Sequence, residues 1–366
     1  EREFNVPINM LRNGTNILAA EVHQTSPTSS DLRFDAWLEA GASGESLDLT
    51  FEGETLVKLR SFDGRNWSAL TEAQFLTDEP QAPVPGDLLI SELQYNPAGP
   101  DEFEFIEIMN AGNQTVDLSN LRLEGGIEFL FPQDARLAPG DFLVVAENQD
   151  FFADRYLDSN STYFYPNIVI AGEWSGRLDD AGERIELKDS LGNVLFSMQY
   201  DNANGWPGRT DGKGSSLELK DPTAAVKNVA ALNSFLSRSS HWQASSLFNG
   251  SPGRLDLARP TLVINETLTH SNIGVDWVEL HNSGDVELPL KDHYLSDQFD
   301  TPFRFAFGEN TMISAGGFMV IHEVELGFAF SELGSDILLT LANDDQIIRF
   351  IDSVDVPATD QETPYG

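Results

Sequence analysis

The sequence has no cysteine and few basic residues: 22 Lys and Arg stand against 59 Asp and Glu among 366 residues, for a formal net charge of −37. Without thiols there can be no disulfide, no thiolate metal site and no cysteine nucleophile. So acidic a chain excludes proteins that bind nucleic acid by neutralising phosphates, and it disfavours docking on anionic lipid. No apolar run approaches the roughly 18 residues of a membrane span. We therefore expect no nucleic-acid partner and no membrane insertion.

The apolar content is that of a folded protein. Hydrophobic residues make up 40% of the chain, so the acidic residues should lie on the surfaces of ordinary domains. Absence of cysteine with strong acidity is typical of a bacterial extracellular or exported protein, and an acidic cytosolic protein is the alternative that composition leaves open. The chain starts at Glu1 and shows no signal sequence, which favours a processed product or a piece of a longer protein.

Short apolar runs between turn residues predict β-structure along most of the chain. Residues 103–109 (FEFIEIM) and 194–200 (VLFSMQY) are such runs, with turn signals such as APGD at 138–141 between them. Helical periodicity is weak. Residues 151–157 and 223–236 predict only short helices.

Four sequence blocks occur twice in the same order, which indicates two copies of one domain. LLISELQYNPAGPDEFEFIEIMN from Leu88 holds the first two blocks, ISE and FIEIMN, which match INE and WVELHN in LVINETLTHSNIGVDWVELHN from Leu262. LAPGDFLVVAE from Leu137 matches ISAGGFMVIHE from Ile313, and GERIELKDSLGN matches GSDILLTLANDD further on. We expect the matched inward positions to be buried in both copies: Ile106/Val278, Ile108/Leu280 and Val144/Val320.

The repeated unit resembles the lamin tail domain, an immunoglobulin-like β-sandwich, in the form found in large secreted bacterial proteins. The residues that carry the resemblance are ISE at 90, FIEIMN at 105, VDLSNLRL at 116 and APGDFLVV at 138. The first copy adds WPGRTDGKGSSLELKDP from Trp206 and HWQASSLFNGSPG from His241. The resemblance implies one sandwich over residues 87–256 and a second over 261–366. The second lacks the last two blocks, so we expect it to be truncated within the stretch that ends the domain.

Residues 1–84 have a different pattern. GTNILAAEVH from Gly14 resembles the last strands of a galactose-binding-like jelly roll, which implies the end of such a module in residues 1–45. Residues 55–75 resemble the final hairpin of a fibronectin-III-like or hexosaminidase C-terminal-like module. Residues 46–84 should therefore hold fibronectin-III-like strands and a Pro-rich linker. The predicted fold class is all-β: tandem immunoglobulin-like β-sandwiches with an additional N-terminal β segment.

Catalytic motifs are missing: the sequence has no GxSxG, no HExxH and no P-loop. Paired carboxylates are the one arrangement that acid–base chemistry could use, because Glu92 and Glu107 recur as Glu266 and Glu279. Alternation along FIEIMN favours a plainer interpretation, in which each glutamate faces solvent or pairs with Lys or Arg. We expect no catalytic residue.

Acidic loops are the candidates for a cation, and calcium suits their hard oxygen ligands. The same residues are preferred in turns, and none follows the EF-hand spacing. The candidate ligands are Asp179, Asp180, Asp201, Asn204, Asp344 and Asp345. No other cofactor is expected.

Two aromatic residues are candidates for a binding surface. Phe105 and Trp277 occupy the same position in the two copies, flanked by inward residues, so both are expected to face outward and could stack on sugar rings. Trp206 and Trp242 lie in Gly- and Pro-rich closing blocks and are expected to be structural.

These features favour a noncatalytic extracellular or cell-surface module, structural or adhesive, within a large secreted bacterial protein or assembly. Its partners would be neighbouring modules or subunits. The alternative is an accessory module of a large secreted enzyme that binds polysaccharide or another polymer. An enzyme in its own right is disfavoured by the missing motifs and the tandem repeat.

Overall fold

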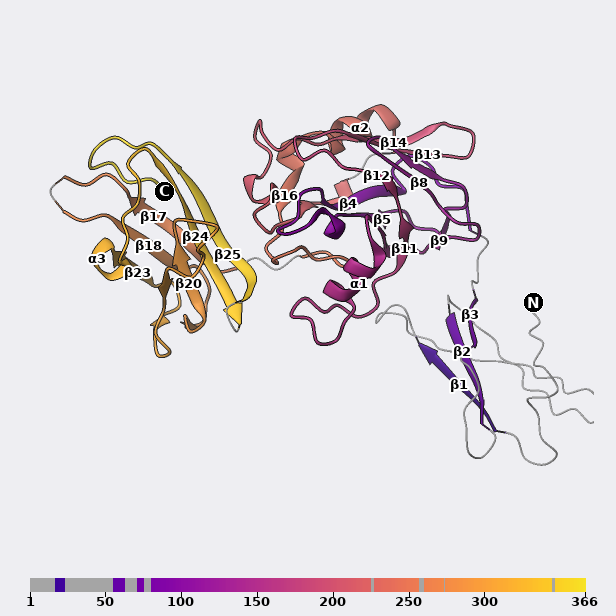
Figure 1. Cartoon of the computed structure of the whole chain (residues 1–366), viewed down its shortest axis with the longest axis horizontal. Coiled ribbons are helices and arrows are strands. Elements are labelled where there is room, and N and C mark those ends of the chain that lie inside the picture. The colour runs from indigo at the N-terminus through magenta and orange to yellow at the C-terminus, as the bar shows by residue number, and fades with distance from the viewer. Residues whose placement is uncertain are drawn as a thin grey trace, which may run out of the picture. The chain divides into compact units, whose positions relative to one another are not determined.

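The computed structural model describes residues 80–224, 227–256, 260–272, 274–343 and 346–366, together with three strands nearer the N-terminus (Figure 1). Residues 1–80 form one compact unit and residues 81–366 another. In the first unit, β1 (Ile17–His23), β2 (Thr55–Phe62) and β3 (Thr71–Phe75) make an antiparallel sheet in that order. The segment predicted over residues 1–45 thus contributes one strand to this sheet, and the segment over 46–84 contributes two. Apart from residues 80–84, the other residues of those segments lie outside the described residues, and the two resemblances stay predictions.

The first sandwich follows in residues 81–256. One sheet has the strand order β11-β10-β5-β4-β15-β16, the facing sheet has the order β12-β8-β7-β13-β14, and β6 pairs with β9. The bounds are β4 (Leu88–Gln94), β5 (Phe105–Asn110), β6 (Val116–Asp117), β7 (Arg122–Glu124), β8 (Ile127–Leu130), β9 (Arg136–Leu137), β10 (Phe142–Ala146), β11 (Ile170–Glu173), β12 (Ser175–Gly176), β13 (Arg184–Lys188), β14 (Val194–Gln199), β15 (Leu217–Leu219) and β16 (Trp242–Ala244).

Two short α-helices interrupt this sandwich, near the two positions that the sequence predicts. α1 (Gln149–Tyr156) follows β10, and α2 (Val229–Leu236) lies between β15 and β16. Each helix begins after an asparagine, Asn148 or Asn228, whose side-chain oxygen accepts hydrogen bonds from first-turn amides. Single 3-10 turns lie at η2 (Asp101–Phe103), η3 (Gly208–Thr210), η4 (Pro222–Ala224) and η5 (Ser239–His241).

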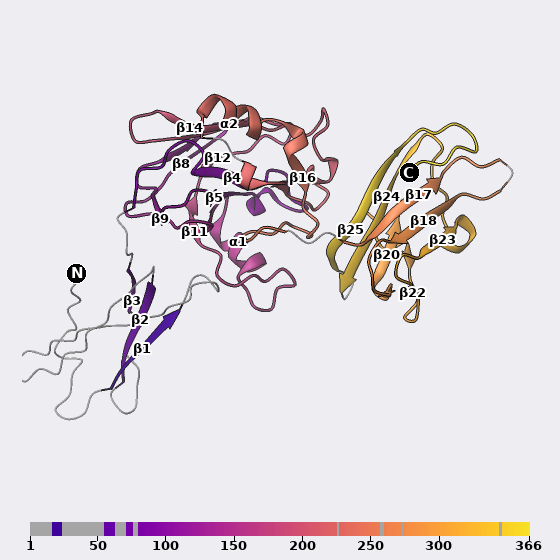
Figure 2. The same cartoon turned by 180° about the vertical axis from the view of Figure 1, so that it is seen from behind.

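The second sandwich, residues 260–366, repeats this order with fewer strands. One sheet has the order β17-β18-β23, the other has the order β21-β20-β24-β25, and β19 pairs with β22 (Figure 2). The bounds are β17 (Leu262–Leu268), β18 (Trp277–Asn282), β19 (Leu288–Pro289), β20 (His293–Ser296), β21 (Phe305–Ala306), β22 (Met312–Ile313), β23 (Phe318–His322), α3 (Glu323–Leu326), β24 (Gly334–Asn343) and β25 (Gln346–Pro357). By order and pairing, β17, β18 and β23 correspond to β4, β5 and β10. Within the described residues, the second sandwich has no counterpart of β11 or β16. The shorter α3 follows β23 as α1 follows β10, and Tyr365 bridges to Thr267 of β17 at the edge where β15 pairs with β4.

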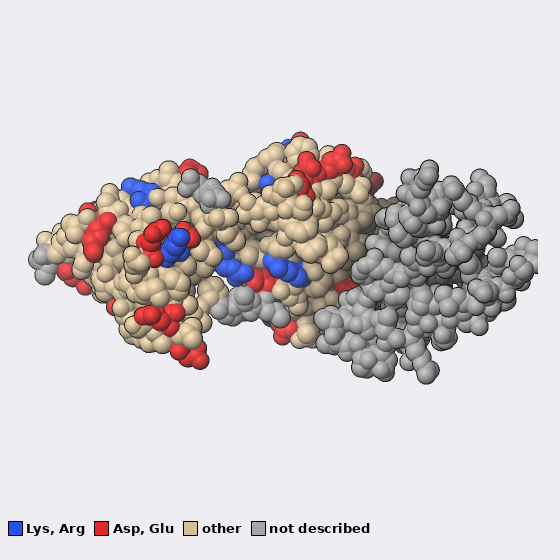
Figure 3. Space-filling model, turned by 90° about the horizontal axis from the view of Figure 1, so that it is seen from below, with Lys and Arg blue, Asp and Glu red and all other residues tan. Residues whose placement is uncertain are grey.

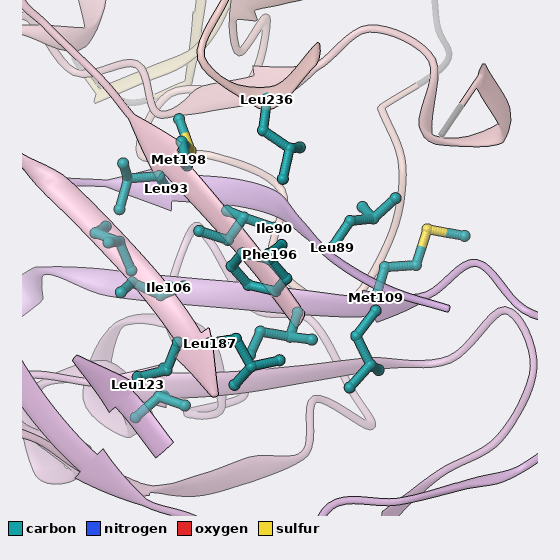
Figure 4. Packing of buried hydrophobic residues seen from close by; sticks show 14 of the residues in the cluster. Leu89, Ile90, Leu93, Ile106, Met109, Leu123, Leu187, Phe196, Met198 and Leu236 are labelled. Atoms are coloured by element: carbon teal, nitrogen blue, oxygen red, sulfur yellow. The ribbon is translucent and has the colours of Figure 1, made fainter. Parts of the chain in front are cut away.

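Each sandwich has its own hydrophobic core. In the first, Ile90 and Ile106 from one sheet gather with Phe196 from the other (Figure 4). The four matched residues of β5 and β18 are fully buried, as predicted: Ile106, Ile108, Val278 and Leu280. The predicted all-β class is therefore confirmed.

The third matched pair behaves differently from the prediction. Val144 is fully buried, whereas Val320 is 42% exposed. Val144 lies opposite Glu107 and Val320 lies opposite Glu279, so both valines belong to the outer face of their sheet and not to the core between the sheets. Val144 is buried because other parts of the first sandwich cover that outer face.

Acidic side chains lie at several separate places on the described surface, with few basic side chains between them (Figure 3). The charge is thus spread over the two sandwiches. Among the described residues, no helix is both long and apolar enough to cross a membrane.

Candidate functional site

The repeated glutamates are placed by a β-bulge that occurs in both copies. The pairing of β4 with β5 shifts register between Ile90 and Glu92, and the pairing of β17 with β18 shifts at the equivalent place. The extra residue in β4 puts Glu92 directly opposite Glu107, and in β17 it puts Glu266 opposite Glu279. The structure thus brings together the carboxylates that the sequence pairs.

The bulge gives each three-stranded set an outer face of nine residues in three rows. Residues that pair directly across strands share a face. The first outer face has the rows Leu89–Met109–Phe142, Glu92–Glu107–Val144 and Gln94–Phe105–Ala146. The second outer face has the rows Val263–His281–Phe318, Glu266–Glu279–Val320 and Leu268–Trp277–His322.

The first outer face is covered by α1 and by residues 249–254, and the stretch after α1 packs beside them through Tyr163, Tyr165 and Ile168. α1 sets the rings of Phe152 and Tyr156 edge-on to Phe105, at centroid distances of 5.5 and 5.9 Å. Residues 249–254, which we call the closing segment, lie over the glutamates. The Tyr156 hydroxyl donates to the Asn249 carbonyl at 2.5 Å and so joins the two covers. Phe105 is fully buried, and its prediction as a binding surface is wrong because α1 lies over it.

Hydrogen bonds from the closing segment end on the glutamates. The Ser251 amide donates to Glu92 Oε1 at 2.8 Å, and the Gly253 amide donates to Glu107 Oε2 at 2.5 Å. Two further hydroxyls complete the contacts: Ser216 donates to Glu92 at 2.5 Å and Ser91 donates to Glu107 at 2.7 Å. The prediction that these two glutamates face solvent or a basic side chain is therefore wrong.

A third carboxylate belongs to the same cluster. Glu218 of β15 lies opposite Glu92 and accepts the Ser251 hydroxyl at 2.8 Å. Sequence analysis missed Glu218, although the block GSSLELKDP around it is one of those that carry the family resemblance. Glu92, Glu107, Glu218 and the closing segment border a small, partly open cavity of about 50 Å³. That is room for a water molecule or two and not for a substrate.

Burial raises the pKa of all three carboxyl groups. The pKa of Glu107 rises to about 8 and that of Glu218 to about 7. For Glu92, burial raises the pKa well above its ordinary range, and the nearby Glu218 and Glu107 raise it further. Hydroxyl and amide donors act in the opposite direction on each group. The cluster therefore retains protons at neutral pH.

The turn in the closing segment needs its glycines. Gly250 has φ +94°, and a β-carbon there would lie 2.2 Å from Glu92 Oε1. Gly253 has φ +84°, and Asn249 has φ 69°. Only a backbone of this shape lets the Ser251 amide approach the glutamates so closely. The residues of the NGSPG motif therefore allow the turn that brings the backbone amides to the carboxylates.

The second outer face is open in part, since Leu268 in its third row is buried. Phe318 is 58% exposed, and its ring stacks on His281 at 4.2 Å. Glu266, Glu279 and Trp277 are half-buried. The outward placement predicted for Trp277 agrees with its row, although the side chain is only partly accessible.

The predicted calcium ligands lie in ordinary turns where they are described. Asp179 accepts the Ala181 amide at 2.8 Å, and Asp201 accepts the Ala203 amide at 2.7 Å. Asp180 is exposed, Asn204 adopts φ 55°, and Asp344 and Asp345 lie outside the described residues. Within the described ranges no group of three or more His, Asp or Glu residues is arranged to hold a metal ion. Calcium binding stays a prediction.

The two closing-block tryptophans are structural, as predicted. Trp242 is buried in the core, and its indole N–H donates to the Leu236 carbonyl at 2.7 Å. Trp206 packs against the same core, with its ring centroid 6.4 Å from that of Trp242.

Comparison with known proteins gives one informative match. The family model described as Lamin Tail Domain matches residues 81–202 and 257–356, together more than half of the chain. No curated protein matches the chain. A solved structure of a DUF4876 family protein from Bacteroides thetaiotaomicron VPI-5482 is similar over 59% of this chain and 88% of that chain, with 10% identity and a TM-score of 0.27. A likeness at that TM-score carries no argument.

Proposed function

The chain belongs to the lamin tail domain family, and from that premise we propose that it is a noncatalytic structural or adhesive module of a large secreted or cell-surface bacterial protein or assembly. Immunoglobulin-like sandwiches generally serve as frameworks, and their function lies in the surfaces they present. An extracellular setting is supported by the absence of cysteine and by the acidic composition.

The observation that carries this proposal is the contrast between the two outer faces. In the first sandwich, Glu92, Glu107 and Glu218 hold the closing segment, and the cavity beside them is too small for a substrate. In the second sandwich, the equivalent face exposes Phe318 and Val320 to solvent. Exposed apolar residues on a regular sheet face are typical of a contact surface. The repeat therefore supports a role in contact between modules.

The alternative is binding of polysaccharide, and Trp277 is the residue that favours it. This indole is half-buried on the second outer face, in the row next to Glu279 and Val320. A partly exposed tryptophan on a sheet offers a flat apolar surface to a sugar ring.

The test uses the intact chain in a polysaccharide pull-down and a turnover assay. A structural module is expected to leave polysaccharides in solution and to hydrolyse neither glycosidic nor phosphoester bonds. Retention that Trp277→Ala abolishes would establish the alternative. Turnover that Glu107→Gln abolishes would overturn the noncatalytic role. Antibody labelling of intact producing cells checks the extracellular location.

A further inference from the structure

We propose that Arg349 of the second sandwich bridges the two ends of the loop that carries the closing segment of the first sandwich. This bridge couples the two sandwiches, because the segment that covers the buried glutamates is then held in part by a residue of the other sandwich. The inference goes beyond the proposed function and does not depend on it, since it concerns how one sandwich stabilises the other within this chain.

Two side chains close the loop at its base. Residues 246–256 follow β16 and contain the closing segment. At the two ends of this loop, the Ser246 hydroxyl donates to Asp256 Oδ2. Arg349 Nη1 reaches both residues, because it donates to Ser246 Oγ at 2.5 Å and lies 3.5 Å from Asp256 Oδ2. The arginine therefore joins the start of the loop to its end.

The bridge is shielded from water. The side chains of Arg349 and Asp256 are 20% and 6% exposed. Salt screens an ion pair of partly buried groups less than one on the open surface, and removing one partner of such a pair is costly for the charge that stays behind. Loss of the Arg349 guanidinium should therefore loosen the base of the loop.

Backbone pairing holds Arg349 in this position. The Phe248 amide donates to the Ile348 carbonyl at 2.9 Å, and the Phe350 amide donates to the Ser246 carbonyl at 2.7 Å. β25 is the last strand of its sheet, so the first residues of the loop pair with an edge whose amides and carbonyls would otherwise face water. This pairing fixes the register that brings Arg349 to the base of the loop.

A buried ring shows that the contact is closely packed. Phe350 is 2% exposed, yet it is not part of the hydrophobic core of the second sandwich. Its ring centroid lies 5.8 Å from that of Phe248 in the first sandwich and 6.4 Å from that of Phe299 in the second. The guanidinium of Arg209 in η3 lies 4.6 Å from the same ring centroid and donates to Ser353 Oγ at 2.6 Å. The first sandwich thus buries an apolar residue of the second, which favours their association.

The loop can transmit this contact to the glutamates because little chain separates the two. Phe248 is bonded to the second sandwich, and the Ser251 amide soon after it is bonded to Glu92. Between them, Asn249 and Gly250 both have left-handed backbone, with φ 69° and 94°. So short a connection in a restricted conformation cannot absorb a large shift at one end. A loosened base should therefore free the Ser251 amide.

The experiment measures hydrogen exchange of the Ser251 and Gly253 amides in the full chain by nuclear magnetic resonance. We expect Arg349→Ala to speed the exchange of both amides at least tenfold. Arg304→Ala is the matched control, because Arg304 pairs with an aspartate of its own sandwich, and it should stay within twofold of the parent. In an Asp256→Asn background, Arg349→Ala should add less than a further twofold, since the two residues act through one pair.

A second variant tests the coupling from the first sandwich and leaves the sequence of the second unchanged. Ser246→Ala removes the hydroxyl that joins Arg349 to Asp256. It should speed exchange at least tenfold for the β25 amides that pair with β24. Ser240→Ala, the same change at an exposed serine of the first sandwich, should leave these amides within twofold of the parent.

Four results would overturn the inference. Exchange at Ser251 and Gly253 that Arg349→Ala leaves within twofold of the parent would exclude the bridge, and so would unchanged β25 exchange in Ser246→Ala. An equal effect of Arg304→Ala would mean that the second sandwich is only loosened in general. A full tenfold effect of Arg349→Ala in the Asp256→Asn background would show that the arginine acts elsewhere. The noncatalytic function stands or falls separately, because turnover and pull-down test it.

Discussion

Among single residues, Glu107 has the clearest consequence for stability. Its pKa rises from an ordinary value of 4.5 to about 8, so between these pH values the folded protein holds a proton that the unfolded chain releases. The free energy of unfolding therefore falls as pH rises through this window, by up to about 1.4 kcal/mol per pH unit for each such group. We expect Glu107→Gln to flatten this slope in urea unfolding between pH 5 and pH 8. Glu128→Gln, an exposed change on β8, should keep the parent slope. Identical slopes in the parent protein and the two variants would contradict the raised pKa of Glu107.

Gly250 allows a second prediction at this scale. Gly250→Ala should destabilise the protein by about 3 kcal/mol or more, because it combines a left-handed backbone with a contact to Glu92 that leaves no room for a β-carbon. Gly192→Ala is the matched control: Gly192 has φ +84°, and a β-carbon added there would meet nothing within 4 Å, so this variant should lose only about 1 kcal/mol. Denaturant unfolding of the two variants measures the difference. Equal losses would mean that the closing segment can move away from Glu92.

At the scale of elements, α1 acts as a lid over the first outer face. Phe152 is fully buried against Phe105, so Phe152→Ala should cost about 3–5 kcal/mol of the unfolding free energy of the first sandwich. Its neighbour Phe151 is 39% exposed, and Phe151→Ala should cost less than about 1 kcal/mol. Thermal unfolding by tryptophan fluorescence compares the two. A small loss for both would show that the sheet is stable without its cover.

The strands and their faces can be predicted from the sequence, but the segments that cover an outer face cannot. Alternation along FIEIMN correctly assigns Ile106 and Ile108 to the core and Glu107 to the opposite side. It cannot tell whether a distant segment lies over that side. For this reason the sequence predicts Glu107 and Phe105 to be accessible. In the structure, Glu107 accepts a hydrogen bond from the Gly253 amide, about 150 positions later in the chain, and Phe105 is covered by α1. The sequence signals that could have indicated the buried glutamates are the motif NGSPG and the repetition of the glutamates, taken together.

At the scale of the whole molecule, the net charge of −37 makes the response to cations the informative measurement. If acidic loops such as those around Asp179 and Asp201 bind calcium, millimolar calcium at fixed ionic strength should raise the melting temperature by mass action, and chelation should lower it. Magnesium at the same ionic strength is the control, because it demands a tighter octahedral site. Equal curves in calcium, magnesium and sodium would exclude calcium binding and leave only screening of the surface charge.

The closing segment is also the stretch of chain that leads, through residues 257–260, to the second sandwich. Tension between the two sandwiches first meets the backbone hydrogen bonds that join Ser246 to Phe350 and Phe248 to Ile348. Once these break, the bonds of Ser251 and Gly253 to the three carboxylates carry the load before it reaches the strands beneath. Peeling this segment away would leave the sandwich folded on its core but stripped over the outer face. Under load, the first sandwich would then present the glutamates that the second presents at rest.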